Sequence, residues 1–178
     1  MDQKWTPIVP LERLLVSGSQ RIVFKVIRGE KTVRCFVAAR PDPKLDEKKR
    51  ESDDDSVRLT IVRKFISEGE SLPATFALEA ACPHMGAPLD ISDIEDLSGV
   101  PSVVCTMHDY KFDMRSGQCT IAGEKEGRIA AKIFPSKIAD HSTEEGGKAP
   151  WVFVDIGDDI LSGWNPVSEF YSCKWFKR

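Results

Sequence analysis

The sequence predicts an all-β protein built from short antiparallel strands. Apolar and polar residues alternate in several segments with the two-residue period of a β-strand. The 178 residues include eleven prolines and twelve glycines, which lie scattered between these segments as turn-forming residues do. No long amphipathic helical pattern competes with the strands, and a chain of this length is expected to form about one domain.

The expected strands begin with a hairpin. Ile22, Phe24 and Val26 share one face of its first strand, and Gly29-Glu30 provides a tight turn into a partner strand over residues 32–39. The same two-residue alternation predicts further strands at residues 57–61, 76–80, 102–105, 132–138 and 151–156.

Two segments depart from the strand pattern. Residues 41–56 hold two prolines, seven acidic side chains and four basic ones, so they have almost nothing to bury and are expected to form a charged, mobile loop. Residues 164–178 form an aromatic and basic C-terminal tail, which is expected either to pack on the β core or to bind a partner.

Composition excludes several classes of protein. The formal net charge of −3 gives no basic surface for nucleic acid or anionic lipid, so no nucleic-acid partner is expected. No apolar run approaches the length of a membrane span, and residues 1–20 lack a secretory or transit signal, so we expect a cytoplasmic protein without a membrane partner. Five cysteines in such a chain suggest reduced thiols or metal ligands. Cys35 is expected in the core, whereas Cys119 and Cys173 are expected to be exposed free thiols.

Two of the three histidines stand beside cysteines. Cys82 is followed by His84 after one residue, and Cys105 by His108 after two. Two thiolates and two imidazoles make a four-ligand set, which indicates either zinc or an iron–sulfur cluster. The remaining histidine, His141, is expected in a hairpin loop. A mononuclear iron site of the kind that oxygenases use needs two histidines and a carboxylate. Only His141 remains outside the four-ligand set, so the chain is not expected to be an oxygenase by itself.

The residues around these pairs decide between the two cofactors. Cys82-Pro83-His84-Met85-Gly86-Ala87-Pro88-Leu89 and Cys105-Thr106-Met107-His108-Asp109-Tyr110-Lys111-Phe112-Asp113 resemble the two cluster loops of Rieske proteins, and soluble Rieske-type ferredoxins and small Rieske domain-containing proteins are the most similar members. The resemblance implies a [2Fe–2S] cluster, with Cys82 and Cys105 on the inner iron and His84 and His108 on the outer iron.

The resemblance also implies an architecture. A Rieske-type domain over residues 1–163 would have an antiparallel β-sandwich or barrel as its base, closed by a final hairpin over residues 132–138 and 151–156. A two-loop cluster-binding subdomain at about residues 78–120 would be inserted into this base. Residues 164–178 would follow as a separate tail.

A low reduction potential is expected within the Rieske class. Two ferric ions, two sulfides, two thiolates and two neutral imidazoles sum to zero charge, so a Rieske cluster is reduced more easily than an all-cysteine cluster. High-potential relatives, however, carry a bridged cysteine pair where this chain has Ala87 and Met107. They also carry a serine and a tyrosine where this chain has Tyr110 and Phe112. Asp109 replaces the usual glycine, and its carboxylate would lower the potential slightly.

The expected function is one-electron transfer without transformation of a substrate. The resemblance implies a flavin reductase as donor and a terminal oxygenase or reductase as acceptor. Two alternatives remain: a small subunit of a larger oxidoreductase such as a nitrite reductase, and a redox-sensing or structural module.

Residues 85–104 contain acids but no lysine or arginine, namely Asp90, Asp93, Glu95 and Asp96. These acids form either a solvated ribbon or a docking patch for a basic redox partner.

Overall fold

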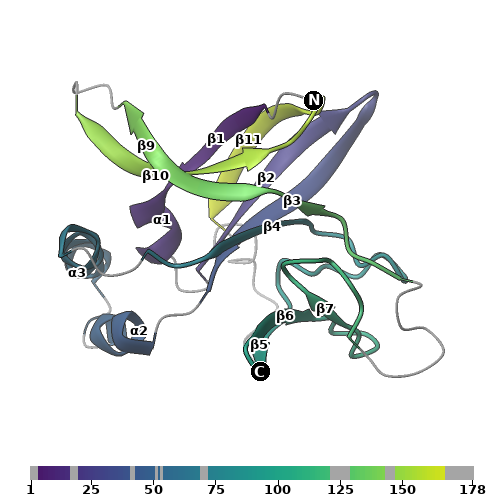
Figure 1. Cartoon of the computed structure of the whole chain (residues 1–178), viewed down its shortest axis with the longest axis horizontal. Coiled ribbons are helices and arrows are strands. Elements are labelled where there is room, and N and C mark those ends of the chain that lie inside the picture. Colours follow the sequence, from purple (N-terminus) through teal and green to yellow (C-terminus); the bar gives the residue numbers. More distant parts are fainter. Residues whose placement is uncertain are drawn as a thin grey trace.

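The computed structural model describes residues 4–16, 20–40, 43–50, 52, 54–68, 72–120, 129–142 and 147–166. Within these residues the chain forms three antiparallel sheets and three helices (Figure 1). The predicted all-β, antiparallel fold class is confirmed. No helix among the described residues is both long and apolar enough to cross a membrane.

The central sheet has five strands in the order β11-β2-β3-β4-β8. The strands are β2 (Arg21–Arg28), β3 (Lys31–Ala39), β4 (Thr75–Glu79), β8 (Ile133–Phe134) and β11 (Ile160–Pro166). Arg28 pairs with Lys31 at the end of the β2–β3 ladder, so the predicted two-residue turn at Gly29-Glu30 is confirmed. Its sharpness depends on Gly29, which has a φ of 60° that few other residues adopt.

A second sheet covers one face of the central sheet and completes the sandwich (Figure 1). It consists of β1 (Trp5–Pro10), β10 (Lys148–Asp155) and β9 (Ser136–Ser142), in that order. The predicted final hairpin is therefore present as β9 and β10, in which Ile138 pairs with Val152. Pro135 separates β9 from β8, and β8 pairs with β4 in the central sheet instead.

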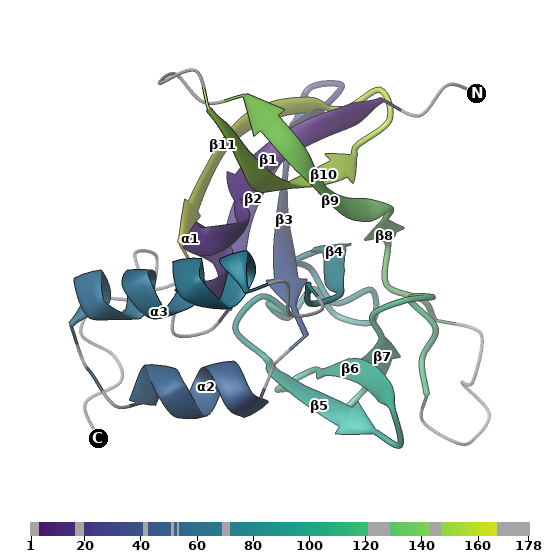
Figure 2. The ribbon, with the colours of Figure 1, turned by 60° about the vertical axis from the view of Figure 1, so that its left-hand side comes forward.

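The third sheet lies on the other side of the central sheet and holds β5 (Asp93–Leu97), β6 (Val100–Val104) and β7 (Lys111–Asp113) (Figure 2). Because successive side chains of a strand point to opposite faces, β2 and β3 contribute to two cores. Phe24 and Cys35 belong to the sandwich core, whereas their neighbours Val23 and Phe36 belong to the core under the third sheet. The first half of β2 and the second half of β3 are thus buried on both faces of the sheet.

The charged segment is helical, which corrects the predicted mobile loop over residues 41–56 and the predicted strand at 57–61. Helix α2 (Pro43–Arg50) is followed by α3 (Asp55–Ser67), and both lie beside the short helix α1 (Leu11–Val16) (Figure 2). The side chain of Asp54 accepts a hydrogen bond from the Ser56 backbone N–H and begins α3. Val62 and Phe65, three residues apart, then share its buried face.

Charge placement explains why α2 forms despite its polarity. Its last turn carries three basic residues, Lys48, Lys49 and Arg50, where the helix dipole favours positive charge. Leu45 is buried in the sandwich core and attaches the helix to the body of the protein. The predicted loop was wrong for α2 because one buried apolar residue, Leu45, is enough to attach this short, polar helix.

The C-terminal boundary also differs from the expectation. Strand β11 pairs with β2 as far as Pro166, three residues beyond the predicted end of the domain at residue 163. Residues 167–178, with Cys173, lie outside the described part of the chain.

Candidate metal centre

The four predicted ligands lie on two loops of the third-sheet subdomain. Cys82 and His84 belong to a first loop, residues 82–89, which connects β4 to β5. Cys105 and His108 belong to a second loop, residues 105–110, which connects β6 to β7. The structure therefore brings together residues that are more than twenty positions apart in the sequence.

The two loops have the same backbone turn. In the first loop, the Gly86 N–H donates to the Cys82 carbonyl at 2.7 Å and the Cys82 N–H donates to the Ala87 carbonyl at 2.8 Å. In the second loop, the Asp109 N–H donates to the Cys105 carbonyl at 3.0 Å, and the Cys105 N–H donates to the Tyr110 carbonyl at 2.8 Å. Each cysteine thus begins a turn of the same length.

The fourth residue after each cysteine has a positive φ, which is 76° at Gly86 and 54° at Asp109. Asp109 occupies the place where related loops carry glycine. Aspartate tolerates this backbone region better than most residues, and Asp109 forms the same turn as Gly86.

Burial separates the cysteines from the histidines. Cys105 is fully buried and Cys82 is 3% exposed, whereas His84 is half-buried and His108 is exposed. The two imidazole rings lie edge to face with their centroids 4.9 Å apart. A buried thiol pair therefore lies at the base of the loops, and an imidazole pair lies toward the surface.

None of the four described cysteines forms a disulfide. Burial raises the pKa of the Cys82 thiol, and a side-chain hydrogen bond with Cys105 acts in the same direction. Backbone N–H groups of His84 and Met85 donate to the Cys82 sulfur and oppose this rise. The first loop therefore directs amide dipoles at a sulfur, an arrangement that stabilises a thiolate.

Tyr110 packs against the imidazole pair on its buried side. Its ring is buried, with its centroid 4.7 Å from that of His84 and 6.3 Å from that of Phe112. Phe112 is fully buried in the same core. Tyr110 and Phe112, which stand where high-potential relatives carry a serine and a tyrosine, thus pack on the buried side of the candidate site.

Two arginines hold the segment that follows the first loop. Asp90 is fully buried and forms an ion pair with Arg34 of β3. Arg21 of β2 donates to the backbone carbonyl of Asp90 at 3.1 Å and to that of Ser92. Sequence reasoning missed both arginines, because they lie in strands far from the loop and carry no local motif.

Two of the four acids in residues 85–104, which were expected to form either a solvated ribbon or a docking patch, have basic partners at the surface. Asp96 pairs with Arg40 at 2.6 Å, and Glu95 pairs with Lys111 at 2.8 Å. Together with the buried Asp90, these pairs leave a surface of mixed charge. Residues 85–104 contain no lysine or arginine, but the fold brings Arg40 and Lys111 from other strands to these acids.

Two other described cysteines, Cys35 and Cys119, and His141 lie outside the two loops. Cys35 is buried in the sandwich core as predicted, and burial raises the pKa of its thiol to about 12. Cys119 is only 3% exposed, which corrects the prediction of an exposed thiol, because its strand bridge to Phe112 places it in the second core. His141 lies in β9 rather than in a loop, with its ring 4.9 Å from Trp151.

No three His, Cys, Asp or Glu side chains of the described residues close around one point as ligands of a single ion do. The four candidate ligands instead form a thiol pair and an imidazole pair.

Part of this chain is similar to known proteins. A family described as soluble Rieske-type ferredoxin matches residues 48–131, which include both loops. A human Rieske domain-containing protein is 43% identical over 42 residues, covering 24% of this chain. The match spans 27% of that protein, or about a quarter of its length.

Two solved structures have a similar outline at low sequence identity. One, described as the small subunit of an NADH-dependent nitrite reductase from Mycobacterium tuberculosis, is 14% identical with a TM-score of 0.47, covering 88% of this chain and 99% of that one. The other, described as the small subunit of an NADPH-dependent nitrite reductase, is 14% identical with a TM-score of 0.46, covering 85% and 97%.

The family match over residues 48–131 and the identity to the human protein lead to one conclusion. Residues 48–131, just under half of the chain, are similar to the soluble Rieske-type ferredoxins, and a Rieske-type domain implies a [2Fe–2S] cluster as cofactor.

Proposed function

We propose that Cys82, Cys105, His84 and His108 hold the cluster. A Rieske centre needs two thiolates on one iron and two imidazoles on the other, so its ligands must come as two pairs. The structure offers a buried thiol pair and an outer imidazole pair on adjacent loops. This division into pairs is the observation that carries the proposal, and it suits a two-iron cluster better than a single zinc ion.

The surrounding residues suit an electron-transfer site. When bound, the cluster accepts and releases one electron. Buried Cys82, Cys105 and Tyr110 exclude water from its inner side. Exposed His108 places an imidazole edge at the surface, and the two loops also expose Met85 at 66% and Met107 at 61%. A partner can therefore approach the histidine side over exposed methionines and the exposed carboxylate of Asp109.

The function that this arrangement supports is a one-electron carrier. The chain would accept an electron from a flavin reductase and pass it to a terminal oxygenase or reductase, and would transform no substrate itself. The position of His141 supports this, because its ring packs against Trp151 and Phe153 in the sandwich. It is therefore placed as an aromatic packing residue rather than as a ligand of a second iron.

The test is cluster content and spectrum in matched variants. Purified protein should contain two irons and two sulfides and show an electron paramagnetic resonance signal on reduction. Cys105→Ser should lose most of the cluster, and His108→Cys should keep a cluster of lower potential, because the added thiolate makes reduction harder. Cys119→Ala is the control, since Cys119 is buried in the same core. Full iron and sulfide in Cys105→Ser, or their loss in Cys119→Ala alone, would refute the ligand assignment.

Electron transfer itself is tested with a flavin reductase and an acceptor such as cytochrome c. Catalytic passage of electrons that depends on this chain supports the carrier. A stoichiometric larger chain that purifies with it, and without which no turnover occurs, would favour a subunit role instead.

The proposed centre has a low potential for its class. Ala87 and Met107 cannot form the bridge of high-potential relatives, and Tyr110 directs a ring, rather than a small hydroxyl side chain, at the site. Fewer hydrogen bonds to the sulfurs leave the reduced state less stabilised. A midpoint above about +200 mV, near the top of the Rieske range, would contradict this proposal.

A further inference from the structure

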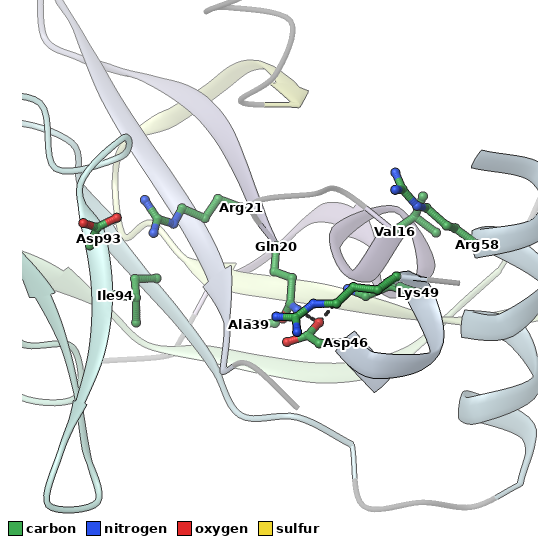
Figure 3. A pocket seen from close by; sticks show the side chains of 10 residues that line it. Val16, Gln20, Arg21, Ala39, Asp46, Lys49, Arg58, Asp93 and Ile94 are labelled. Carbon is green, nitrogen blue, oxygen red and sulfur yellow. Dashed lines mark hydrogen bonds and ion pairs between the residues drawn. The ribbon is translucent and has the colours of Figure 1, made fainter. Parts of the chain in front are cut away.

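A pocket of about 400 Å³ lies between the inserted helices and the third sheet (Figure 3). Helices α2 and α3 line one side of it, the beginning of β2 lines its floor, and Asp93 and Ile94 of β5 line the opposite side. Its volume lies within the range of small-molecule sites. None of the candidate cluster ligands lines it, so it is separate from the metal centre.

Positive charge is concentrated in this pocket. Its lining includes four cations, Arg21, Lys49, Arg50 and Arg58, and two acids, Asp46 and Asp93. These described residues give the lining an excess of two positive charges, although the whole chain has a net charge of −3. The local excess therefore has the opposite sign to the charge of the protein.

Two of the cations are nine-tenths buried. Arg21 is 9% exposed and Lys49 is 8% exposed. Burial lowers the pKa of Arg21, and the nearby carboxylates of Asp93 and Asp90 only partly oppose this. A buried positive charge is costly unless negative charge compensates it, so this pocket favours an anion.

The existing contacts account for part of this charge. The Lys49 ammonium pairs with Asp46 at 3.0 Å and donates to the Leu15 carbonyl at 2.9 Å. Asp46 also accepts a hydrogen bond from Gln20 (Figure 3). Arg21 donates to two backbone carbonyls, which are neutral acceptors. On the helix side, Arg58 also pairs with Asp55 at 3.5 Å and donates to the Ser52 carbonyl at 2.8 Å. Arg21 lies beside the carboxylate of Asp93 (Figure 3).

We propose that this pocket binds a small organic anion with a phosphate or carboxylate head group. Arg21, Arg50 and Arg58 supply guanidinium groups, whose planar N–H donors match the oxygens of both head groups. Val16, Ala39 and Ile94 supply apolar wall for the organic part of the ligand. The site is independent of the proposed electron carrier, because binding needs no turnover.

The experiment is calorimetric titration of the holoprotein with phenyl phosphate, inorganic phosphate and succinate. The double variant Arg50→Gln/Arg58→Gln removes two charges from the rim. The matched control, Lys48→Gln/Lys64→Gln, removes one charge from each of the same two helices at exposed positions that do not line the pocket. Lost charge-assisted hydrogen bonds should weaken binding by about tenfold or more in the rim variant, and by less than about twofold in the control.

The three probes distinguish the head group. Tighter binding of either phosphate compound identifies a phosphate site, and tighter binding of succinate identifies a carboxylate site. Titration of the wild-type protein should also shift the methyl resonances of Val16, which needs no variant to fold. Absence of saturable binding for all three probes, or equal weakening in the rim and control variants, would overturn the proposal.

Discussion

Asp109 and Gly86 occupy equivalent positions in the two loops, each four residues after a cysteine, and both have a positive φ. An added Cβ at Gly86 would meet no heavy atom within 4 Å, so the backbone conformation alone favours glycine there. At the equivalent position, Asp109 keeps the same turn but brings a carboxylate next to His108. The difference between the two loops is therefore one of charge more than of shape.

The charge at Asp109 has a measurable consequence. Asp109→Asn keeps a residue that tolerates a positive φ but removes a negative charge beside the outer imidazole. Reduction adds negative charge to the site, so the midpoint potential should rise, by less than about 60 mV. The rise should shrink with added salt, because Asp109 is exposed. Protein-film voltammetry measures it, and Asp140→Asn in β9 is the control; an equal shift in both variants would contradict a local effect.

The sequence of helix α3 fits both the two-residue period of a strand and the spacing of a helix face. Val57, Leu59 and Ile61 alternate as strand residues do, but the buried face is formed by Val62 and Phe65. Val57 is 42% exposed. The helix packs against α1, and an ion pair between Arg63 and Glu12 at 2.8 Å adds a surface contact.

Substitutions distinguish the helix from the strand. Phe65→Ala should lower the free energy of unfolding by about 3 kcal/mol, because it creates a cavity in the sandwich core. Val57→Ala should change it by less than about 0.5 kcal/mol, as exposed positions do. Urea unfolding followed by circular dichroism measures both. A larger loss at Val57 than at Phe65 would restore the strand interpretation.

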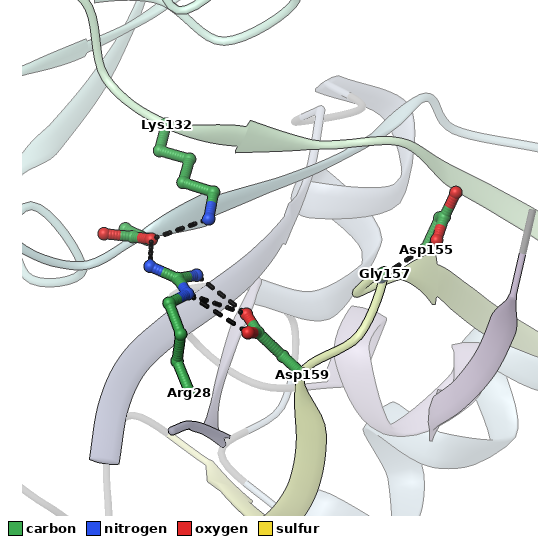
Figure 4. A network of polar contacts seen from close by, with 6 residues as sticks. Arg28, Lys132, Asp155, Gly157 and Asp159 are labelled. Carbon is green, nitrogen blue, oxygen red and sulfur yellow. Dashed lines mark hydrogen bonds and ion pairs between the residues drawn. The ribbon is translucent and has the colours of Figure 1, made fainter. Parts of the chain in front are cut away.

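The ends of four strands meet at an ion-pair network (Figure 4). Arg28, at the end of β2, pairs with Asp159 just before β11 at 2.7 Å and with Glu79 of β4 at 2.6 Å. Lys132, just before β8, pairs with Glu79 at 3.4 Å. The hydrogen bonds from Arg28 lower the pKa of Asp159.

This lowered pKa predicts an acid effect on stability. Because the folded pKa of Asp159 lies below its unfolded value of about 3.9, its contribution is present above that pH and is lost as the pH falls through the folded pKa. Asp159→Asn should therefore be less stable than wild type at neutral pH, with the difference narrowing below about pH 4. Thermal unfolding across this range tests it. A difference that is constant with pH would show that Asp159 acts without its charge.

The whole molecule consists of two cores on opposite faces of one sheet. The sandwich core contains residues of β1, β10 and the helices, whereas the second core contains both cysteines of the thiol pair. Val23 and Phe36, which pair across β2 and β3, face the second core. The cluster site therefore rests on a sheet that the sandwich stabilises from behind.

This division predicts the effect of removing the cluster. Loss of the cluster leaves buried thiols and an imidazole pair without the metal that joins the two loops, so local opening should increase there. Hydrogen exchange should accelerate in β5, β6 and β7 and stay within about twofold in β1, β9 and β10. Mass spectrometry of apo and holo protein provides the comparison. Equal acceleration in both cores would mean that the protein unfolds as one unit.

The sequence by itself predicted the candidate ligands and most of the strands. The spacing of Cys82 and His84, and of Cys105 and His108, is a local pattern, and so is the alternation that predicts β2 and β3. Such patterns can be recognised in the sequence because the residues that form them are neighbours in one strand or one turn.

Tertiary structure alone decided which residues meet across the chain. Arg21 and Arg34 reach the segment after the first loop from strands more than fifty residues away, and Arg40 pairs with Asp96 in the same way. The helical state of residues 43–50 and 55–67 likewise depends on packing, since Leu45 and Phe65 form their contacts only once the sandwich exists. Side-chain packing and charge pairing depend on distance in space, and the order of residues does not encode that distance directly.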